Sequence, residues 1–82
     1  MAEFTVDDVV DARNMMCPMP VLAVAKAMRL LQPRQVIKVL ATDRGALSDI
    51  PAWVEDTGNE LLAAETDSEL FTFYIRKGVG DD

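Results

Sequence analysis

Apolar residues recur along the first half of the chain with the spacing of a helix. In residues 18–32 (PMPVLAVAKAMRLLQ), one apolar stripe is formed by Val21, Ala25, Met28 and Leu31, and Leu22 widens it. This spacing is typical of an amphipathic helix packed on a core. Pro33 follows directly and is expected to end the helix.

Residues 35–42 (QVIKVLAT) have the spacing of a strand instead, and they are rich in β-branched residues. Ile37, Val39 and Ala41 fall on one face, and Lys38 falls on the other. This pattern predicts a strand with one buried face. A shorter strand is predicted at Val9–Ala12, between aspartates.

A second helix is predicted after Asp49, which we interpret as its N-cap. Ile50 and Pro51 then occupy the first turn, where proline costs little. Gly58 has the residue type that commonly follows a helix end. The pattern also allows a turn or short helical stretch before this helix, from Ala46.

Two further strands are predicted at residues 60–66 and 70–77. Asp67 and Ser68 are expected to join them as a hairpin. In the second of these strands, a buried face is predicted for the alternating residues Phe71, Phe73 and Ile75.

The predicted order is therefore β-α-β-α-β-β. A β-α-β unit places its two strands parallel, whereas a hairpin is antiparallel, so the sheet is mixed. We expect an α+β fold, a two-layer α/β sandwich in which two helices cover one face of four strands. The strand order does not follow from the pattern. The 82 residues predict a single domain, 1–82, with its core at about 9–78.

The amino-acid composition excludes several kinds of site and ligand. One cysteine and no histidine exclude an internal disulfide and a structural zinc site, and we expect neither metal nor cofactor. The acidic N-terminus does not resemble a signal peptide, and no apolar run reaches membrane length, so we expect a cytoplasmic protein. A net charge of −6 argues against direct nucleic-acid binding. It suits a soluble monomer and a basic partner surface.

The single thiol lies in an unusual setting, NMMCPMP. We interpret Cys17 as the N-cap of the first helix, followed by Pro18, Met19 and Pro20, where prolines sacrifice no helical hydrogen bond. The helix dipole then favours the thiolate, so we expect an accessible Cys17 with a lowered pKa. Burial as a small apolar residue is the alternative.

Elimination limits what this thiol can do. A hydrolytic cysteine enzyme needs a base, usually histidine, and a dithiol oxidoreductase needs a resolving cysteine. Neither residue is available. What remains is a thiolate that other proteins load and unload, or a redox sensor that forms mixed disulfides through Cys17.

Three segments together resemble the TusA/SirA family of small sulfur carriers. These are DARNMMCPMPVL, with the Cys-Pro-x-Pro motif at Cys17, Pro18 and Pro20; SDIPAWVEDTGNEL; and FYIRKG. The resemblance covers about residues 9–78. It implies the same β-α-β-α-β-β sandwich and a persulfide carried on Cys17, in a sulfur-transfer protein rather than an independent turnover enzyme.

The resemblance also implies partners. Sulfur would come from a cysteine desulfurase or a rhodanese-like donor and pass to an acceptor such as a DsrE/TusD-like protein. Routes of this family lead to tRNA thiolation, molybdenum cofactor assembly or sulfur oxidation. A regulatory or scaffolding module, with an incidental thiol, is the alternative function.

The chain departs from the family pattern around the thiol. Asn14 replaces a usual glycine, and asparagine tolerates the left-handed conformation. Met16 and Met19 replace residues that are often Arg and Glu. With Met15, they predict an apolar rim suited to docking, unless they pack inward. Asp49 has two interpretations, helix cap and partner contact.

Overall fold

Four strands and two helices follow one another in the predicted order. The computed structural model describes residues 5–78. The elements are β1 (Asp8–Ala12), α1 (Met19–Arg29), β2 (Val36–Ala41), α2 (Ala46–Asp56), β3 (Glu60–Asp67) and β4 (Leu70–Arg76).

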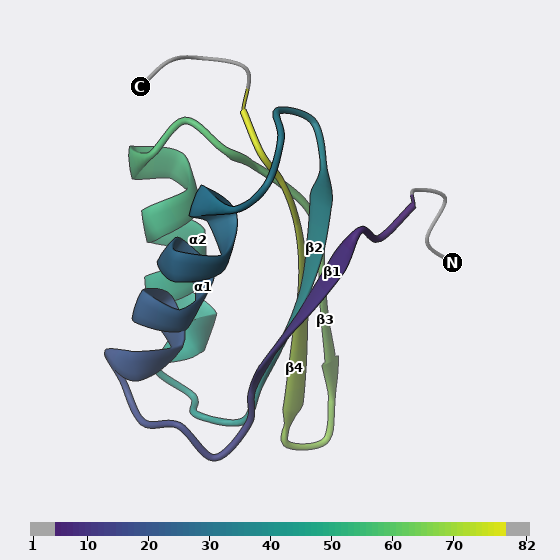
Figure 1. Ribbon diagram of the computed structural model, residues 1–82. Helices are drawn as coiled ribbons and strands as arrows, with labels where there is room; N and C mark the ends of the chain where they lie inside the picture. Colours follow the sequence, from purple (N-terminus) through teal and green to yellow (C-terminus); the bar gives the residue numbers. More distant parts are fainter. Residues whose placement is uncertain (1–4, 79–82) are drawn as a thin grey trace.

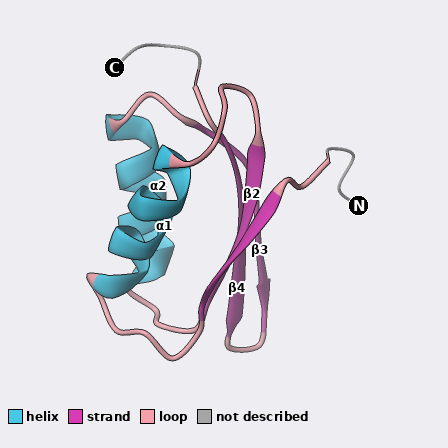
Figure 2. Cartoon of the chain, viewed as in Figure 1, coloured by secondary structure: helices cyan, strands magenta, loops and turns pink. Residues whose placement is uncertain are grey.

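The strands form one mixed sheet in the order β1-β2-β4-β3. β1 and β2 are parallel, whereas β4 runs antiparallel to both β2 and β3. Both helices lie against the same face of the sheet (Figure 1 and Figure 2). The α+β two-layer sandwich predicted from the sequence is therefore confirmed.

The core lies between this sheet face and the two helices. The sheet contributes fully buried residues from its two central strands, Ile37, Val39, Ala41, Phe71, Phe73 and Ile75. The helices contribute Val24, Met28, Ile50 and Val54, and Trp53 packs against this cluster while partly exposed. Removing this apolar area from water is the main force that holds the layers together.

β4 is buried on both faces, which the alternation did not predict. Thr72 and Tyr74, on the face away from the helices, are 7% and 8% exposed. β4 lies between β2 and β3, so its neighbours cover these side chains from both sides. The Lys38 ammonium lies 5.8 Å from the centre of the Tyr74 ring, within the range of a cation–π contact.

Three boundaries differ from the predicted ones. α1 ends at Arg29, before the predicted end at Gln32, and the residues that follow form the turn toward β2. The β3–β4 turn consists of Ser68 and Glu69, since Asp67 still pairs with Leu70.

The second helix begins at Ala46, so the interpretation of Asp49 as its N-cap is wrong. The N-cap position is Gly45, and Pro51 lies inside the helix rather than in its first turn. The aspartate that supports this start is Asp43: its carbonyl accepts the Ala46 N–H, and its carboxylate accepts the Gly45 N–H. A side-chain acceptor of this kind satisfies a backbone donor at the helix start.

Backbone conformation at two turns matches the residue types expected there, whereas a third turn has a residue that rarely adopts it. Asn14 has a φ of 67°, which confirms that it takes the left-handed conformation. Gly58, with φ 76°, follows α2 as predicted. Arg34 adopts φ 76° in the turn before β2, a conformation that is uncommon for a residue other than glycine.

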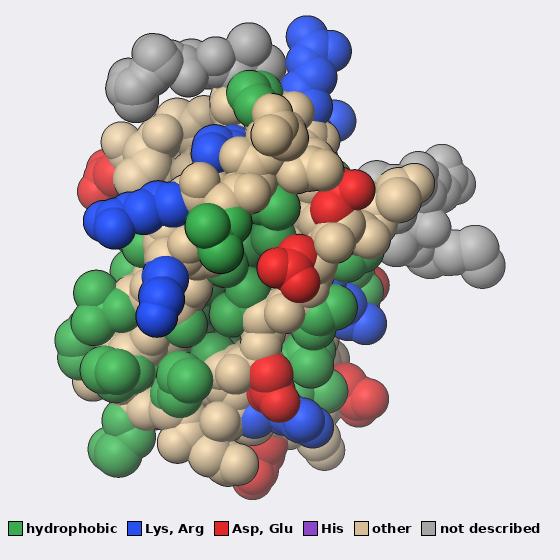
Figure 3. Space-filling model, in the orientation of Figure 1, with side chains coloured by type: hydrophobic (Ala, Val, Ile, Leu, Met, Phe, Trp, Pro, Cys, Tyr) green, Lys and Arg blue, Asp and Glu red, His purple; other side chains and the backbone are tan. Residues whose placement is uncertain are grey.

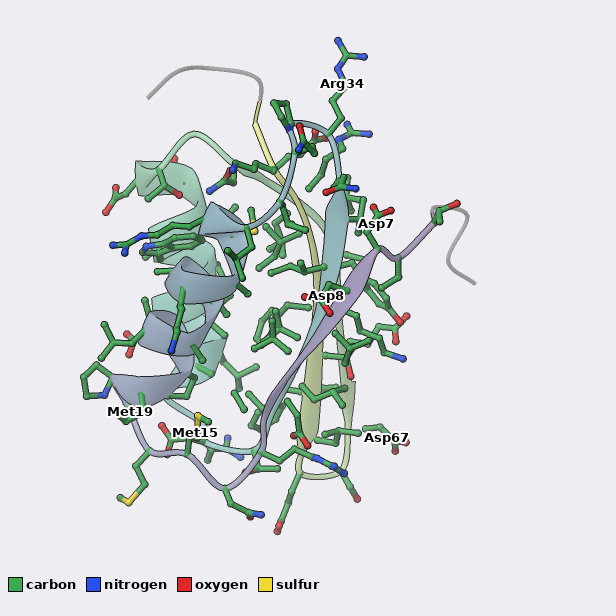
Figure 4. All side chains as sticks on the ribbon, viewed as in Figure 1. Asp7, Asp8, Met15, Met19, Arg34 and Asp67 are labelled. Atoms are coloured by element: carbon green, nitrogen blue, oxygen red, sulfur yellow. The ribbon has the colours of Figure 1, made fainter. Side chains whose placement is uncertain are left out.

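One end of the molecule collects the segments around the predicted thiol. The carboxyl ends of β1 and β2 and the amino ends of both helices meet there (Figure 1). Met15 and Met19 lie at this end and Arg34 at the opposite one (Figure 4). Among residues 5–78, no helix is both long and apolar enough to cross a membrane.

Candidate functional site

Cys17 lies in the loop that joins β1 to α1, and its side chain is exposed. The helix begins at Met19, two residues later, so the predicted placement of the thiol at a helix start is confirmed. Its predicted accessibility is also confirmed, and the alternative of a buried, space-filling cysteine is excluded.

The cap itself is shifted by one residue from the prediction. Pro18, not Cys17, occupies the N-cap position, and the Cys17–Pro18 peptide bond is cis. The Pro18 carbonyl accepts the first helical hydrogen bond, from the Leu22 N–H at 3.2 Å. Pro20 is buried and anchors the first turn of α1 on the core side. Both prolines lie at the start of α1, directly after the thiol in the chain.

Asp49 contacts the thiol directly. It is the fourth residue of α2, and its Oδ2 accepts a hydrogen bond from Cys17 Sγ. The two residues are 32 positions apart in the chain. The interpretation of Asp49 as a helix cap is wrong, and the structure places its carboxylate beside Cys17 Sγ. A contact between Asp49 and a partner stays a prediction.

A second carboxylate, that of Asp43, completes the site and was not predicted from the sequence. Asp43 Oδ2 accepts the Cys17 N–H at 3.3 Å and the Gly45 N–H at 3.2 Å, so it joins the thiol loop to the start of α2. The sequence carried a usable signal: Asp43 and Gly45 stand just before the first apolar residue of the helix.

Gly45 allows these groups to come together. A Cβ atom at this position would lie 2.8 Å from Asp43 Oδ2 and 3.3 Å from Cys17 Cβ. Any side chain would therefore push against both residues. The α2 backbone approaches the thiol closely because residue 45 has no side chain.

The pKa of the Cys17 thiol is raised, which makes the predicted lowering wrong. The largest cause is the hydrogen bond to Asp49, followed by partial desolvation and the negative charges of Asp49 and Asp43. A thiolate next to two carboxylates suffers like-charge repulsion. This repulsion and the hydrogen bond to Asp49 both favour the protonated thiol.

The nearby arginine does not offset these charges. Arg13 pairs with Asp11: its Nε lies 2.8 Å from Asp11 Oδ1, and its Nη2 lies 2.9 Å from Asp11 Oδ2. This pairing lowers the pKa of Asp11 to about 2, mainly through the side-chain hydrogen bond from Arg13. Arg13 is thereby held by Asp11, and the charges that act on Cys17 are negative.

Exposed methionines border the thiol. Met16 is 74% exposed and Met19 is 51% exposed, so their outward orientation is confirmed, whereas Met15 is half-buried. Leu22, one turn along α1 from Met19, is exposed as well. Figure 3 shows hydrophobic side chains gathered at the lower left, where Figure 1 places the beginning of α1. We call Met16, Met19 and Leu22 the apolar rim.

Residues 8–77 match the family described as Sulfurtransferase TusA. The chain belongs to the TusA family. The matched range contains the thiol loop, both carboxylates and every element of the fold.

Relatives of the TusA family align along most of the chain. It is 40% identical to the putative sulfur carrier protein YrkI of Bacillus subtilis, over 88% of this chain and 96% of that protein. It is 38% identical to the sulfur carrier protein TusA of Allochromatium vinosum, over 94% and 99% respectively. A crystal structure of a SirA-like protein from Desulfitobacterium hafniense superposes with a TM-score of 0.70 and 27% identity, over 87% and 97% of the two chains.

Proposed function

We propose that this protein is a sulfur carrier that holds one sulfane sulfur as a persulfide on Cys17. The observation that carries the proposal is an exposed, solitary thiol at the start of α1, within a chain of the TusA family. Relatives that align over nearly their whole length bear the name sulfur carrier protein. The residues around Cys17 support the same role, because Pro18 and Pro20 lie beside it at the start of α1 and Asp49 contacts its sulfur.

The loading step is a thiol–persulfide exchange. Cys17 Sγ attacks the outer sulfur of a donor persulfide, forming a new S–S bond while the donor's own S–S bond breaks. The donor cysteine leaves with the electron pair. The proton released by Cys17 passes to that leaving thiolate, and the Asp49 carboxylate lies where it can accept it on the way. Unloading is the same exchange with an acceptor thiolate as the attacking group.

We propose protein partners at both ends of this transfer. A cysteine desulfurase or a rhodanese-like protein would supply the sulfur, and a DsrE/TusD-like protein would accept it. The route would end in tRNA thiolation, molybdenum cofactor assembly or sulfur oxidation. The apolar rim supports docking by a protein, because it surrounds the thiol with exposed apolar side chains at an accessible end of the molecule.

Intact-mass measurement tests the proposal. After incubation with a cysteine desulfurase and cysteine, or with a loaded rhodanese, the protein should gain the mass of one sulfur atom. A thiol reductant should then remove it. If several active donors leave the mass unchanged, Cys17 is not a persulfide carrier.

The apolar rim also favours a second candidate, a regulatory or scaffolding module that docks without using its thiol. A redox sensor that forms mixed disulfides through Cys17 uses the same accessible thiol and is a further alternative. Donor-dependent sulfur gain separates the carrier from the docking module.

Met16→Lys and Met19→Lys should each weaken partner binding about tenfold, since burying a methionine in an interface contributes roughly 1.5–3 kcal/mol. Stability should change by no more than about 0.5 kcal/mol, as both side chains are exposed. Calorimetric titration with the donor and thermal unfolding measure the two effects. Leu30→Lys is the matched control, because Leu30 is exposed at the far end of α1. A large loss of stability would show that the methionines pack inward, contrary to their exposure.

A further inference from the structure

The surroundings of Cys17 are negatively charged on both sides. Asp49 approaches the thiol from α2, and Asp43 approaches from the loop between β2 and α2. These two carboxylates are the charged groups that act on the thiol, and Arg13, in the loop that holds Cys17, is paired with Asp11. A thiol used for nucleophilic attack is usually placed near positive charge, so this arrangement requires an explanation.

We propose that Asp43 and Asp49 form a charge filter, which lets Cys17 exchange sulfur with compounds that carry positive charge near the reacting sulfur and rejects anionic ones. This inference rests on the proposed function and specifies the partner: a donor or acceptor with a lysine or arginine beside its reactive cysteine. Small anionic sulfane-sulfur compounds would be poor donors.

The filter follows from charge pairing at short range. An anion that approaches Sγ meets two carboxylates whose oxygens lie within hydrogen-bond reach of Cys17. At such separations, unit charges interact appreciably even in the high effective dielectric of a protein surface. A cation that approaches Sγ experiences attraction where an anion experiences repulsion. It is attracted to the same carboxylates, and its charge stabilises the thiolate that forms as the proton leaves.

The carboxylates are also held in place, which a filter requires. Asp43 is fixed by the Cys17 and Gly45 N–H groups, and Asp49 is fixed by its position in α2. Because Gly45 leaves no room for a side chain, the thiol loop and the α2 start stay in contact. Hydrogen bonds therefore tie both carboxylates to Cys17, Asp43 through its N–H and Asp49 through Sγ.

Charged disulfides test the filter without any partner protein. Cystamine carries two positive charges, and 5,5′-dithiobis(2-nitrobenzoate) carries two negative ones. Mixed-disulfide formation is followed by intact mass at neutral pH and low salt, and each rate is divided by that of N-acetylcysteine amide. In the wild type, the normalised cation-to-anion rate ratio should be about tenfold or more above unity. In 1 M salt it should fall toward unity.

Variants of Asp43 and Asp49 test whether these two carboxylates cause the difference between the cation and anion rates. In Asp43→Asn/Asp49→Asn, the ratio should fall to within about threefold of unity. The matched control is Glu55→Gln/Asp56→Asn, which removes the same net charge from the exposed last turn of α2, about 10 Å further along the helix. This control should keep the wild-type ratio. Circular dichroism and reaction with neutral 4,4′-dithiodipyridine establish that each variant is folded with an accessible thiol. The single variants Asp43→Asn and Asp49→Asn extend the test if the double variant does not fold.

An unchanged ratio in the double variant, or an equal fall in the control, would overturn the filter. Neither result depends on sulfur carriage. If donors fail to load Cys17 while the ratio still responds to Asp43 and Asp49, the proposed function is wrong and the filter stands. If donors load Cys17 and the ratio does not respond, the carrier stands without a filter.

Discussion

Replacing Cys17 by serine is expected to abolish sulfur loading completely while the fold remains intact. The variant has no thiol at all, because Cys17 is the single cysteine of the chain. A serine hydroxyl cannot replace it, since the exchange needs a sulfur nucleophile. The side chain is exposed, so the free energy of unfolding should change by about 0.5 kcal/mol or less. Intact mass after incubation with a sulfur donor and thermal unfolding measure the two results.

A relocated thiol provides the control. In Cys17→Ser/Glu55→Cys, the only thiol is moved to the exposed last turn of α2, away from the site. If loading requires the placed thiol, this variant should gain no sulfur from a protein donor, although small disulfides should still modify it. Equal loading of the relocated thiol would mean that accessibility alone is sufficient. The apolar rim and the carboxylates would then have no part in transfer.

The fold was largely predictable because its determinants are local. Alternation in β2 and β4 reports which faces are buried, and the structure confirms those two faces. In α1 the predicted stripe was only partly right: Met28 is buried, but the other buried residues are Pro20 and Val24, and Leu22 is exposed. The strand order was not predictable, since periodicity identifies a buried face but not the neighbouring strand. Thr72 and Tyr74 are buried because β4 lies in the centre of the sheet. Their burial was not predicted, because it depends on the strand order.

The candidate site was only partly predictable. The Cys-Pro-x-Pro segment indicated an accessible thiol at a helix start, which is a local property. Asp43 accepts the Cys17 N–H and Asp49 accepts a hydrogen bond from the Cys17 thiol, from 26 and 32 positions along the chain. Their approach depends on the packing of α2 beside α1 and on the absence of a side chain at Gly45. The helix dipole pointed to a lowered pKa, but the tertiary contacts reverse it.

The start of α2 shows how one misplaced boundary hid this chemistry. The segment Asp49-Ile50-Pro51 has the residue types of a helix start, and interpreting it so assigned the Asp49 carboxylate to capping. In the structure, α2 begins one turn earlier, so Asp49 is available to the thiol. The proline inside the helix leaves the Leu47 carbonyl without its usual N–H partner.

Asp49→Asn is expected to make Cys17 more reactive toward a neutral alkylating agent. The substitution keeps the shape of the side chain but removes the negative charge that is among the causes of the raised thiol pKa. The pH profile of iodoacetamide alkylation, followed by intact mass, should move to lower pH, and the rate at pH ~7.5 should rise several-fold because the thiolate is the nucleophile. Asp56→Asn, at the other end of α2, should leave the profile unchanged.

The same substitution should change stability at alkaline pH, and the sign follows from linkage. The folded-state pKa of Cys17 lies above the ordinary value of 9.0, so the folded state retains the thiol proton longer than the unfolded state. The resulting stabilisation is fully present below pH 9.0 and is lost as the pH rises through the folded-state pKa. Asp49→Asn should therefore lose less stability above pH ~9 than the wild type in urea unfolding. If the alkylation profile and the alkaline stability of Asp49→Asn both match the wild type, Asp49 does not hold the thiol proton. Its contact with Cys17 would then be without consequence for the chemistry of the sulfur.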